Sequence, residues 1–291
     1  MAAADELGYR PNALARIMSE QSNLIGVVMG EITNPFYPEV LEILLQELEA
    51  AGFRVLLKHL DKAQQADSAI EEVLAYRVRA IIVTSSFVSA GMAERCAASE
   101  VPVVLFNRHI RDVQISSISC DNVDAGRMIA NLFLDAGHRR PAFISGSTVA
   151  TSNLDRKKGF LDRVAERGGW KVPVVGDEHS YAVGFSGARE LIAMCDRPDA
   201  LFCASDVIAF GALDALKAAD IAVPGEVSVV GFDDIPMAAW SAFNLTTIRQ
   251  PRRRMVKEAV EMMITCIKGV STNSVRLVPG ELVLRGTLRT G

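Results

Sequence analysis

A regular alternation of short apolar runs with amphipathic segments is the feature that most constrains the fold of this chain. Runs such as Leu24–Met29, Ala80–Thr84 and residues 101–106 are continuously apolar, which is typical of strands buried on both faces of a parallel sheet. Between them, segments such as residues 35–51 carry apolar side chains at helical spacing and end at a glycine. The pattern predicts doubly wound α/β layers with right-handed crossovers.

A second series of the same kind begins near residue 115. We expect further strands at residues 115–119, 141–145, 172–175, 200–204 and 227–232, and helices at 123–136, 153–167, 185–194, 206–219 and 255–268. Because these units exceed one ordinary sheet, we predict two Rossmann-like lobes. Residues 22–120 plus 249–278 would form the N-terminal lobe, and residues 121–248 plus 279–291 the C-terminal lobe. Ligands bind beyond the carboxyl ends of parallel strands, so two facing lobes predict a cleft between them.

Composition narrows the function classes. The 291 residues carry a formal net charge of −4, which argues against a mainly electrostatic nucleic-acid binder, and no apolar run is long enough to span a bilayer. The cysteines form no C-x-x-C pair and the first residues resemble no secretion signal, so we expect a cytoplasmic protein without membrane contact. No G-x-G-x-x-G loop, Walker A loop or H-E-x-x-H metal motif occurs. We therefore expect neither enzymatic activity nor a cofactor or metal.

Hydrogen-bonding and stacking side chains follow the expected strands instead, and one more, Arg156, lies just before Gly159 on an expected helix. They are Asn34, Phe36, Tyr37, Asn107, Arg108, Asp121, Arg156, Ser205, Asp206, Asp233 and Trp240. Carboxylates accept pairs of hydroxyls, a guanidinium donates a fork of N–H groups, and aromatic faces cover the apolar side of a ring. The set suits a neutral polyhydroxylated ligand.

Some of these residues have structural alternatives. Asp206 could be only a helix N-cap, Phe36 and Tyr37 could form a hydrophobic staple, and Trp240 could belong to the core. Asp233 is harder to explain, because a carboxylate after a buried strand needs a partner and its sequence neighbours supply none.

Four arginines surround Pro251 before the last long helix, at positions 249, 252, 253 and 254. Positive charges in a first helical turn oppose the helix dipole. A solvated or interface surface is the favoured interpretation, and an anion site is the alternative.

A series of motifs resembles the LacI/GalR family of bacterial transcriptional regulators over essentially the whole chain. They are LGYRPNALAR, NLIGVV, NPFY, CDNVDAG, GHRR, RKKGF, SDVIAFGAL, VPGEVSVVGFDDIP and LTTIRQP. The resemblance implies a homodimeric repressor whose type I periplasmic-binding-protein-like core holds a small effector, usually a sugar or nucleobase-like molecule, between its lobes.

The resemblance also implies which residues contact the effector. They are Phe36, Tyr37, Asn107, Arg108, Asp121, Arg156, Ser205 and Asp233. Trp240 remains a candidate from its place after a strand, and Tyr181 is a candidate because His179 occupies a place that is often aromatic. Asn107 stands where many members have aspartate, and Ser205 where many have asparagine, so the effector's identity stays open.

Residues 1–21 resemble the family's junction between DNA-binding headpiece and hinge helix. The matching hinge positions are Asn12, Ala15, Arg16 and Met18, where Met18 replaces a leucine that wedges between base steps. Most of the helix-turn-helix is expected to be missing, so operator DNA binding is expected only of the full-length protein. The alternative class is a sugar-binding protein of a transport system, which would need an export signal and would usually be monomeric.

Overall fold

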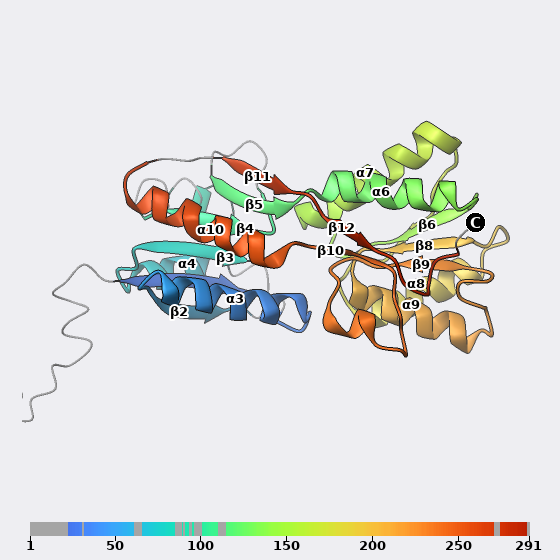
Figure 1. Ribbon diagram of the computed structural model, residues 1–291, viewed down its shortest axis with the longest axis horizontal. Coiled ribbons are helices and arrows are strands. Elements are labelled where there is room, and N and C mark those ends of the chain that lie inside the picture. Colours follow the sequence, from blue (N-terminus) through green and yellow to red (C-terminus); the bar gives the residue numbers. More distant parts are fainter. Residues whose placement is uncertain are drawn as a thin grey trace, which may run out of the picture.

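Two α/β lobes lie side by side along the long axis of the computed structural model (Figure 1). The structure describes residues 23–30, 32–60, 66–84, 89, 91–92, 95, 101–109, 115–270 and 274–289. The four predicted hinge residues lie outside this described part. Among the described residues, no helix is both long and apolar enough to cross a membrane.

The N-terminal lobe is built on a parallel six-stranded sheet in the order β11-β5-β4-β3-β1-β2. Its strands are β1 (Leu24–Met29), β2 (Arg54–His59), β3 (Ala80–Thr84), β4 (Val103–Phe106), β5 (Ser116–Cys120) and β11 (Val275–Val278). The continuous apolar runs of β1, β3 and β4 are buried on both faces, as predicted. Helices α3 (Phe36–Ala50) and α10 (Arg252–Ile267) cover one face, and α4 (Ala66–Leu74) covers the other.

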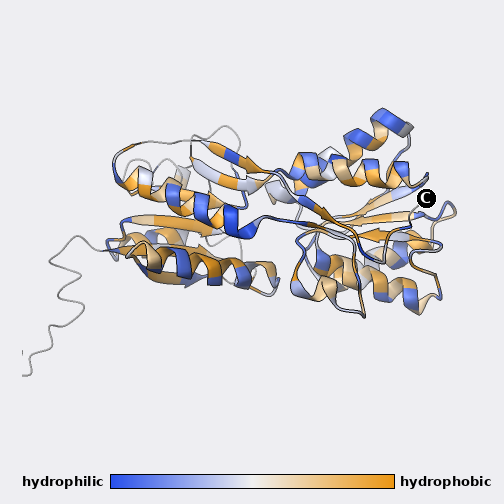
Figure 2. Cartoon of the chain, in the orientation of Figure 1, coloured by the Kyte–Doolittle hydropathy of each residue, from blue (hydrophilic) through white to orange (hydrophobic). Residues whose placement is uncertain are grey.

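The C-terminal lobe is built on a parallel four-stranded sheet in the order β7-β6-β8-β9. Its strands are β6 (Pro141–Ile144), β7 (Val174–Val175), β8 (Ala200–Cys203) and β9 (Ser228–Val230). Helices α6 (Asn122–Asp135) and α7 (Thr151–Gly168) form one packed pair, and α8 (Tyr181–Ile192) and α9 (Asp206–Ala218) form another. The helices are apolar toward the sheet and polar toward solvent, as Figure 2 shows by the two colours along each of them.

Glycines set the spacing within each helix pair. A Cβ on Gly126 of α6 would collide with the backbone carbonyl of Arg156, and one on Gly159 of α7 would collide with that of Val123. In the same way, a Cβ on Gly184 of α8 would collide with the Ile208 carbonyl of α9, and one on Gly211 of α9 with the Tyr181 carbonyl of α8. The backbones of each pair are therefore in direct contact, and the contact of α6 with α7 fixes the position of Arg156.

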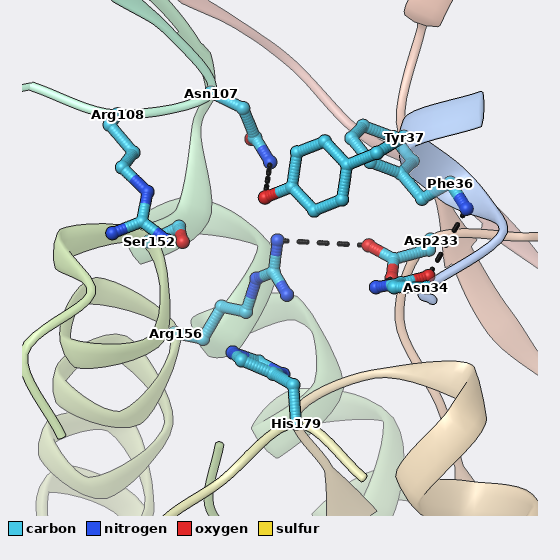
Figure 3. Close-up of a pocket in the computed structure, with 9 residues that line it drawn as sticks. All are labelled: Asn34, Phe36, Tyr37, Asn107, Arg108, Ser152, Arg156, His179 and Asp233. Carbon is cyan, nitrogen blue, oxygen red and sulfur yellow. Dashed lines mark hydrogen bonds and ion pairs between the residues drawn. The ribbon is translucent and has the colours of Figure 1, made fainter. Parts of the chain in front are cut away.

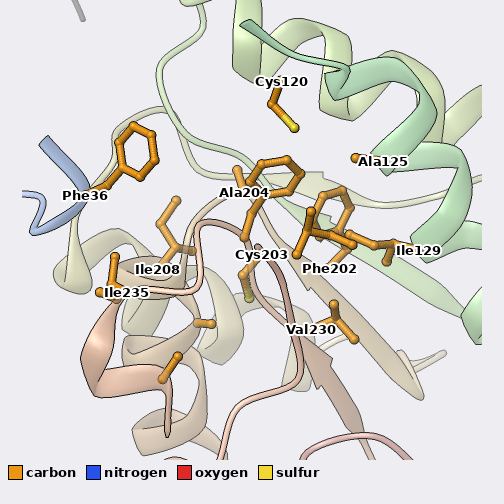
Figure 4. Packing of buried hydrophobic residues seen from close by; sticks show 14 of the residues in the cluster. Phe36, Cys120, Ala125, Ile129, Phe202, Cys203, Ala204, Ile208, Val230 and Ile235 are labelled. Carbon is orange, nitrogen blue, oxygen red and sulfur yellow. The ribbon is translucent and has the colours of Figure 1, made fainter. Parts of the chain in front are cut away.

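The two lobes are joined by a small antiparallel sheet of β10 (Thr247–Arg249) and β12 (Glu281–Val283), which lies at the centre of Figure 1. One cluster of buried apolar residues also runs through both lobes. Figure 4 shows part of it at their junction, where Phe36 of α3 belongs to the same cluster as Ala204, Ile208 and Ile235. The lobes thus share apolar packing beside the connecting strands.

The buried carboxyl group of Asp206, the first residue of α9, forms hydrogen bonds with the segment that leads into β10 and with β10 itself. Asp206 has no exposed surface and accepts hydrogen bonds from Thr247 Oγ1 at 2.6 Å and Ile235 N at 2.9 Å. The alternative that Asp206 is a helix N-cap is wrong, because the cap is Ser205, whose hydroxyl accepts from Ile208 N. Burial, and after it the charge of Asp233, raises the pKa of Asp206 well above its ordinary value.

Several helices begin earlier than the apolar periodicity predicted. The helix expected at 185–194 begins at Tyr181, because the hydroxyl of Ser180 caps it by accepting from Val183 N. The last helix begins at Arg252 directly after Pro251, so the neighbouring arginines do occupy its first turn. Apolar periodicity does not reveal the start of a helix whose first turn is polar.

Candidate functional site

A small pocket lies where the two lobes meet (Figure 3). It is lined by Asn34, Phe36, Tyr37, Asn107, Arg108, Ser152, Arg156, His179 and Asp233. Residues 34–37 follow β1, residues 107–108 follow β4 and Asp233 follows β9, so the carboxyl ends of strands from both sheets supply much of the lining. This is the position where open α/β sheets bind ligands.

Arg156 on α7 is a buried cation of this pocket. Its Nε donates to Asn122 Oδ1 at 2.8 Å, its Nη1 donates to the Ala204 carbonyl at 2.6 Å, and its guanidinium lies 3.5 Å from the centre of the Phe232 ring. The third nitrogen, Nη2, is 3.8 Å from Asp233 Oδ1. Burial lowers the pKa of Arg156, and the charge of Asp233 opposes that shift.

Asp233 receives its partners from far away in the sequence. Gln250 Nε2 donates to its Oδ1 at 2.7 Å, and Asn34 Nδ2 lies 3.4 Å from its Oδ2. Its backbone has φ +118°, a strained value for a residue with a side chain. Burial raises the pKa of Asp233, while Arg156, Gln250 and Asn34 oppose the rise. One carboxylate therefore links a loop of the N-terminal lobe, a connecting segment and a helix of the C-terminal lobe.

Oδ1 of Asn107 and Nδ1 of His179 are buried polar atoms of the pocket without a hydrogen-bond partner among the described residues. Asn107 has φ +60°, which asparagine tolerates, and its Nδ2 lies 3.5 Å from the Tyr37 hydroxyl. Buried polar atoms normally find partners, so atoms left without one at a pocket wall point to a bound ligand or water.

His179 and Ser152 are pocket residues that the sequence did not indicate. The imidazole of His179 packs where a Cβ on Gly146 would collide with it, so the small residue after β6 makes room for the ring. Burial, and then the charges of Arg156 and Arg108, lower the pKa of His179 to about 3. The imidazole is therefore neutral at physiological pH.

Besides Asp206, four of the candidate residues lie outside the pocket lining. Asp121 caps α6 by accepting from Asp124 N at 3.0 Å, and Ser205 caps α9. Tyr181 is 44% exposed and donates its hydroxyl to Asp214 at 2.6 Å. Trp240, which follows the short helix η2 (Pro236–Ala239), is 56% exposed, so the alternative that it is a core residue is wrong. The structure brings the other six predicted contact residues together: Phe36, Tyr37, Asn107, Arg108, Arg156 and Asp233.

The arginines around Pro251 line a separate groove between α3 and α10. Arg249 pairs with Asp234 at 2.7 Å, Arg252 with Glu39 at 3.2 Å, and Arg254 with Glu258 at 2.8 Å. Because neighbouring carboxylates already pair with these arginines, the arrangement favours a solvated or interface surface over an anion site. In the described part of the chain, no group of His, Cys, Asp and Glu side chains is arranged to hold a metal ion.

Comparisons with known proteins agree with this geometry. Residues 130–288 match the family described as periplasmic binding protein-like domain. The transcriptional repressor PurR of Photobacterium profundum is 29% identical, over 99% of this chain and 88% of the relative. The regulator AscG of Escherichia coli is 30% identical, over 98% of this chain and 87% of the relative.

Solved structures give the same result. A LacI transcriptional regulator from a Rhodococcus species superposes with a TM-score of 0.83 at 26% identity, over 91% of this chain and 98% of that one. The regulator CelR in complex with cellobiose also has a TM-score of 0.83 at 26% identity, over 98% of this chain and 88% of CelR.

The fold and the pocket at the lobe junction define a type I periplasmic-binding-protein-like core. Within that class, the chain belongs to the LacI/GalR family of transcriptional regulators. The relatives are regulators, which favours this function over that of a transport protein with the same two lobes.

The depressed pKa of His179 predicts an acid-sensitive fold. The unfolded chain binds a proton at this site below a pH of about 6.5, whereas the folded chain does so only near a pH of about 3. Stability is therefore lost as the pH falls below 6.5, and His179→Gln should lessen that loss. Thermal unfolding of the variant and the wild type at pH values from about 7 to about 4, a range within which the two pKa values place the loss, measures how much less stability the variant loses.

Ser152→Ala is the matched control, because it alters the same pocket wall without removing a titratable group. Its midpoint should follow that of the wild type across the pH range. Parallel slopes for His179→Gln and the wild type would contradict the assignment of a neutral, buried imidazole.

Proposed function

We propose that the pocket at the lobe junction binds a small sugar-like effector that controls a DNA-binding repressor. The observation that carries this proposal is the convergence of polar side chains from both lobes, where Asn107 Oδ1 and His179 Nδ1 lack partners among the described residues. The structural relative CelR binds cellobiose, and this supports a carbohydrate ligand. Trp240 and Tyr181 are not included among the proposed contacts, because they lie outside the lining.

The proposed mechanism is a population shift between lobe arrangements. Asn34, Tyr37 and Asn107 belong to the predicted N-terminal lobe, and Arg156 and Asp233 to the predicted C-terminal lobe, with the divisions near residues 121, 248 and 279. A ligand that contacts both sets favours the arrangement in which both reach it. The N-terminal lobe leads directly into residues 1–21, whose proposed role is that of a hinge to the headpiece that reads operator DNA. Effector binding would thereby change the spacing of two hinges in a dimer.

The proposed homodimer would bury exposed apolar side chains on both lobes. Leu45 of α3 and Leu57 of β2 are 40% and 47% exposed, and Tyr181 and Trp240 are 44% and 56% exposed. Helix α3 and strand β2 lie along the same long side of the molecule as α8 and α9 (Figure 1). Exposed apolar side chains of this size favour a self-complementary interface. We further propose that the protein works in the cytoplasm and is not an enzyme, in line with its regulator relatives.

The effector site predicts that Asp233→Asn weakens sugar binding without unfolding the protein. The change keeps the shape of the side chain but removes the charge that accepts ligand hydroxyls, so affinity should fall about 10- to 100-fold. A thermal-shift screen against sugars and sugar derivatives identifies a ligand, since 100 times Kd stabilises by about 2.7 kcal/mol. Calorimetry then compares the variant with the wild type.

Asp214→Asn is the control for this experiment, because its carboxylate accepts from the surface residue Tyr181 and lies outside the pocket lining. It should bind the same ligand as the wild type does. Full affinity in Asp233→Asn would reject the site assignment.

The dimer proposal predicts that Trp240→Glu shifts the protein toward monomers. A buried charge at the interface should raise the dimer dissociation constant at least about tenfold. Sedimentation over a concentration series measures it, with Tyr76→Glu as the control because Tyr76 is 60% exposed directly after α4. A wild-type protein that is monomeric at all concentrations would favour the transport alternative.

A further inference from the structure

Asp234 is a buried residue that holds three arginines next to the pocket residue Asp233. Arg249 Nε donates to its Oδ2 at 2.7 Å, and Arg285 Nη2 donates to its Oδ1 at 2.6 Å. Arg252 donates to its backbone carbonyl from Nη1 and Nη2, each at 3.2 Å. Hydrogen bonds from charged donors are stronger than those between neutral groups. Asp234 is therefore the centre of what we call the Asp234 cluster, which consists of Asp234, Arg249, Arg252 and Arg285.

The three arginines of the Asp234 cluster come from different segments of the chain. Arg249 ends β10 and Arg285 follows β12, the two strands that join the lobes at the centre of Figure 1. Arg252 is the first residue of α10, which packs on the N-terminal sheet, and its Nη1 also pairs with Glu39 of α3 at 3.2 Å. Asp234 itself lies in the loop after β9 of the C-terminal lobe. The cluster therefore links both connecting strands to helices of the N-terminal lobe.

The backbone joins this cluster to the pocket through two consecutive residues with positive φ. The values are +118° at Asp233 and +52° at Asp234. Residues with side chains keep such angles only where the surrounding structure holds them, and they gather at ligand sites and switch regions. Asp233 is held by its amide, which donates to the Ile248 carbonyl at 2.9 Å, and by Gln250. Because the backbone is fixed on both sides, a movement of Asp233 has to be accompanied by a movement of Asp234.

Asp234 does not line the pocket, so it acts on a ligand only through Asp233. We infer that Asp234 is a positioning residue that couples the pocket to the relative orientation of the two lobes. When an effector moves Asp233, the Asp234 cluster transmits the movement to β10, β12 and α10. The inference rests on the proposed function, and it names the residue through which effector binding reaches the N-terminal lobe.

Asp234→Asn tests this role on the full chain without a ligand. Asparagine tolerates the φ of +52° as aspartate does, so the backbone is kept. The charge is lost, and an N–H₂ group replaces one of the two acceptor oxygens that face arginines. Amide hydrogen exchange, measured by mass spectrometry, should become at least about tenfold faster in residues 244–250 and 280–287 and stay unchanged in β3 and β8.

Glu166→Gln is the matched control, because Glu166 also accepts hydrogen bonds from two arginines. Its partners Arg127 and Arg163 lie on α6 and α7, within the C-terminal lobe. This variant should leave exchange in both connecting segments at the wild-type rate. Wild-type exchange in these segments of Asp234→Asn would overturn the inference. An equal rise over both sheets would overturn it too, because it is the sign of a merely structural role.

The coupling is also testable from the pocket side, with Asp234 intact. Among the described residues, the side chain and amide of Asp233 form no hydrogen bond with residues 280–287. Asp233→Asn should nevertheless make exchange there at least about threefold faster, because the change is transmitted through Asp234. Arg285→Met removes the contact of this segment with the Asp234 carboxylate, so adding Asp233→Asn to it should cause no further rise.

An equal effect of Asp233→Asn with and without Arg285, or no effect at all, would contradict the coupling through Asp234. These outcomes are independent of the search for a sugar ligand, since the exchange measurements use none. If no sugar stabilises the chain in the thermal-shift screen, the sugar-like effector is rejected, while the exchange measurements alone decide the role of Asp234.

Discussion

The guanidinium of Arg156 must be satisfied inside the protein, because an unpaired buried cation would cost several kcal/mol. Three different parts of the C-terminal lobe meet this requirement: the first residue of α6, the carbonyl after β8 and the ring of Phe232 after β9. Each contact fixes one side of the guanidinium and leaves Nη2 toward the pocket. The lobe junction depends on this cation because Arg156 pairs with Asp233. Asp233 in turn accepts hydrogen bonds from Asn34 and Gln250.

Helix packing determines where that cation lies. Gly126 and Gly159 let α6 and α7 touch backbone to backbone, and Arg156 stands one turn before Gly159 on the contact face. A wider spacing would separate Arg156 from Asn122, which donates its own amide to Ser119 and to the Cys120 carbonyl at the end of β5. Small residues far from any ligand thus position the charged group of the pocket and connect it to the N-terminal sheet.

The sequence predicted the parts of the structure that depend on local patterns. Strand–helix alternation gave the α/β class, and residues directly after strands, such as Tyr37, Asn107 and Asp233, were indicated as pocket candidates because strand ends meet at one sheet edge. The partners of Asp233 could not be predicted, since Asn34 lies 199 positions away and Gln250 lies 17 away. Trp240 and Tyr181 were also candidates, yet both side chains are exposed and lie outside the pocket lining.

A pocket made by two lobes couples ligand chemistry to lobe geometry. The contact of 3.8 Å between Arg156 and Asp233 is the one that a bound effector would replace. The most direct test is a crystal structure of the chain with its effector bound. We expect an effector oxygen within about 3.2 Å of Arg156 Nη2, and contacts from Asn107 as well as Asp233. An effector bound without contact to Arg156, or bound in the groove that includes Arg252 and Arg253, would contradict the account.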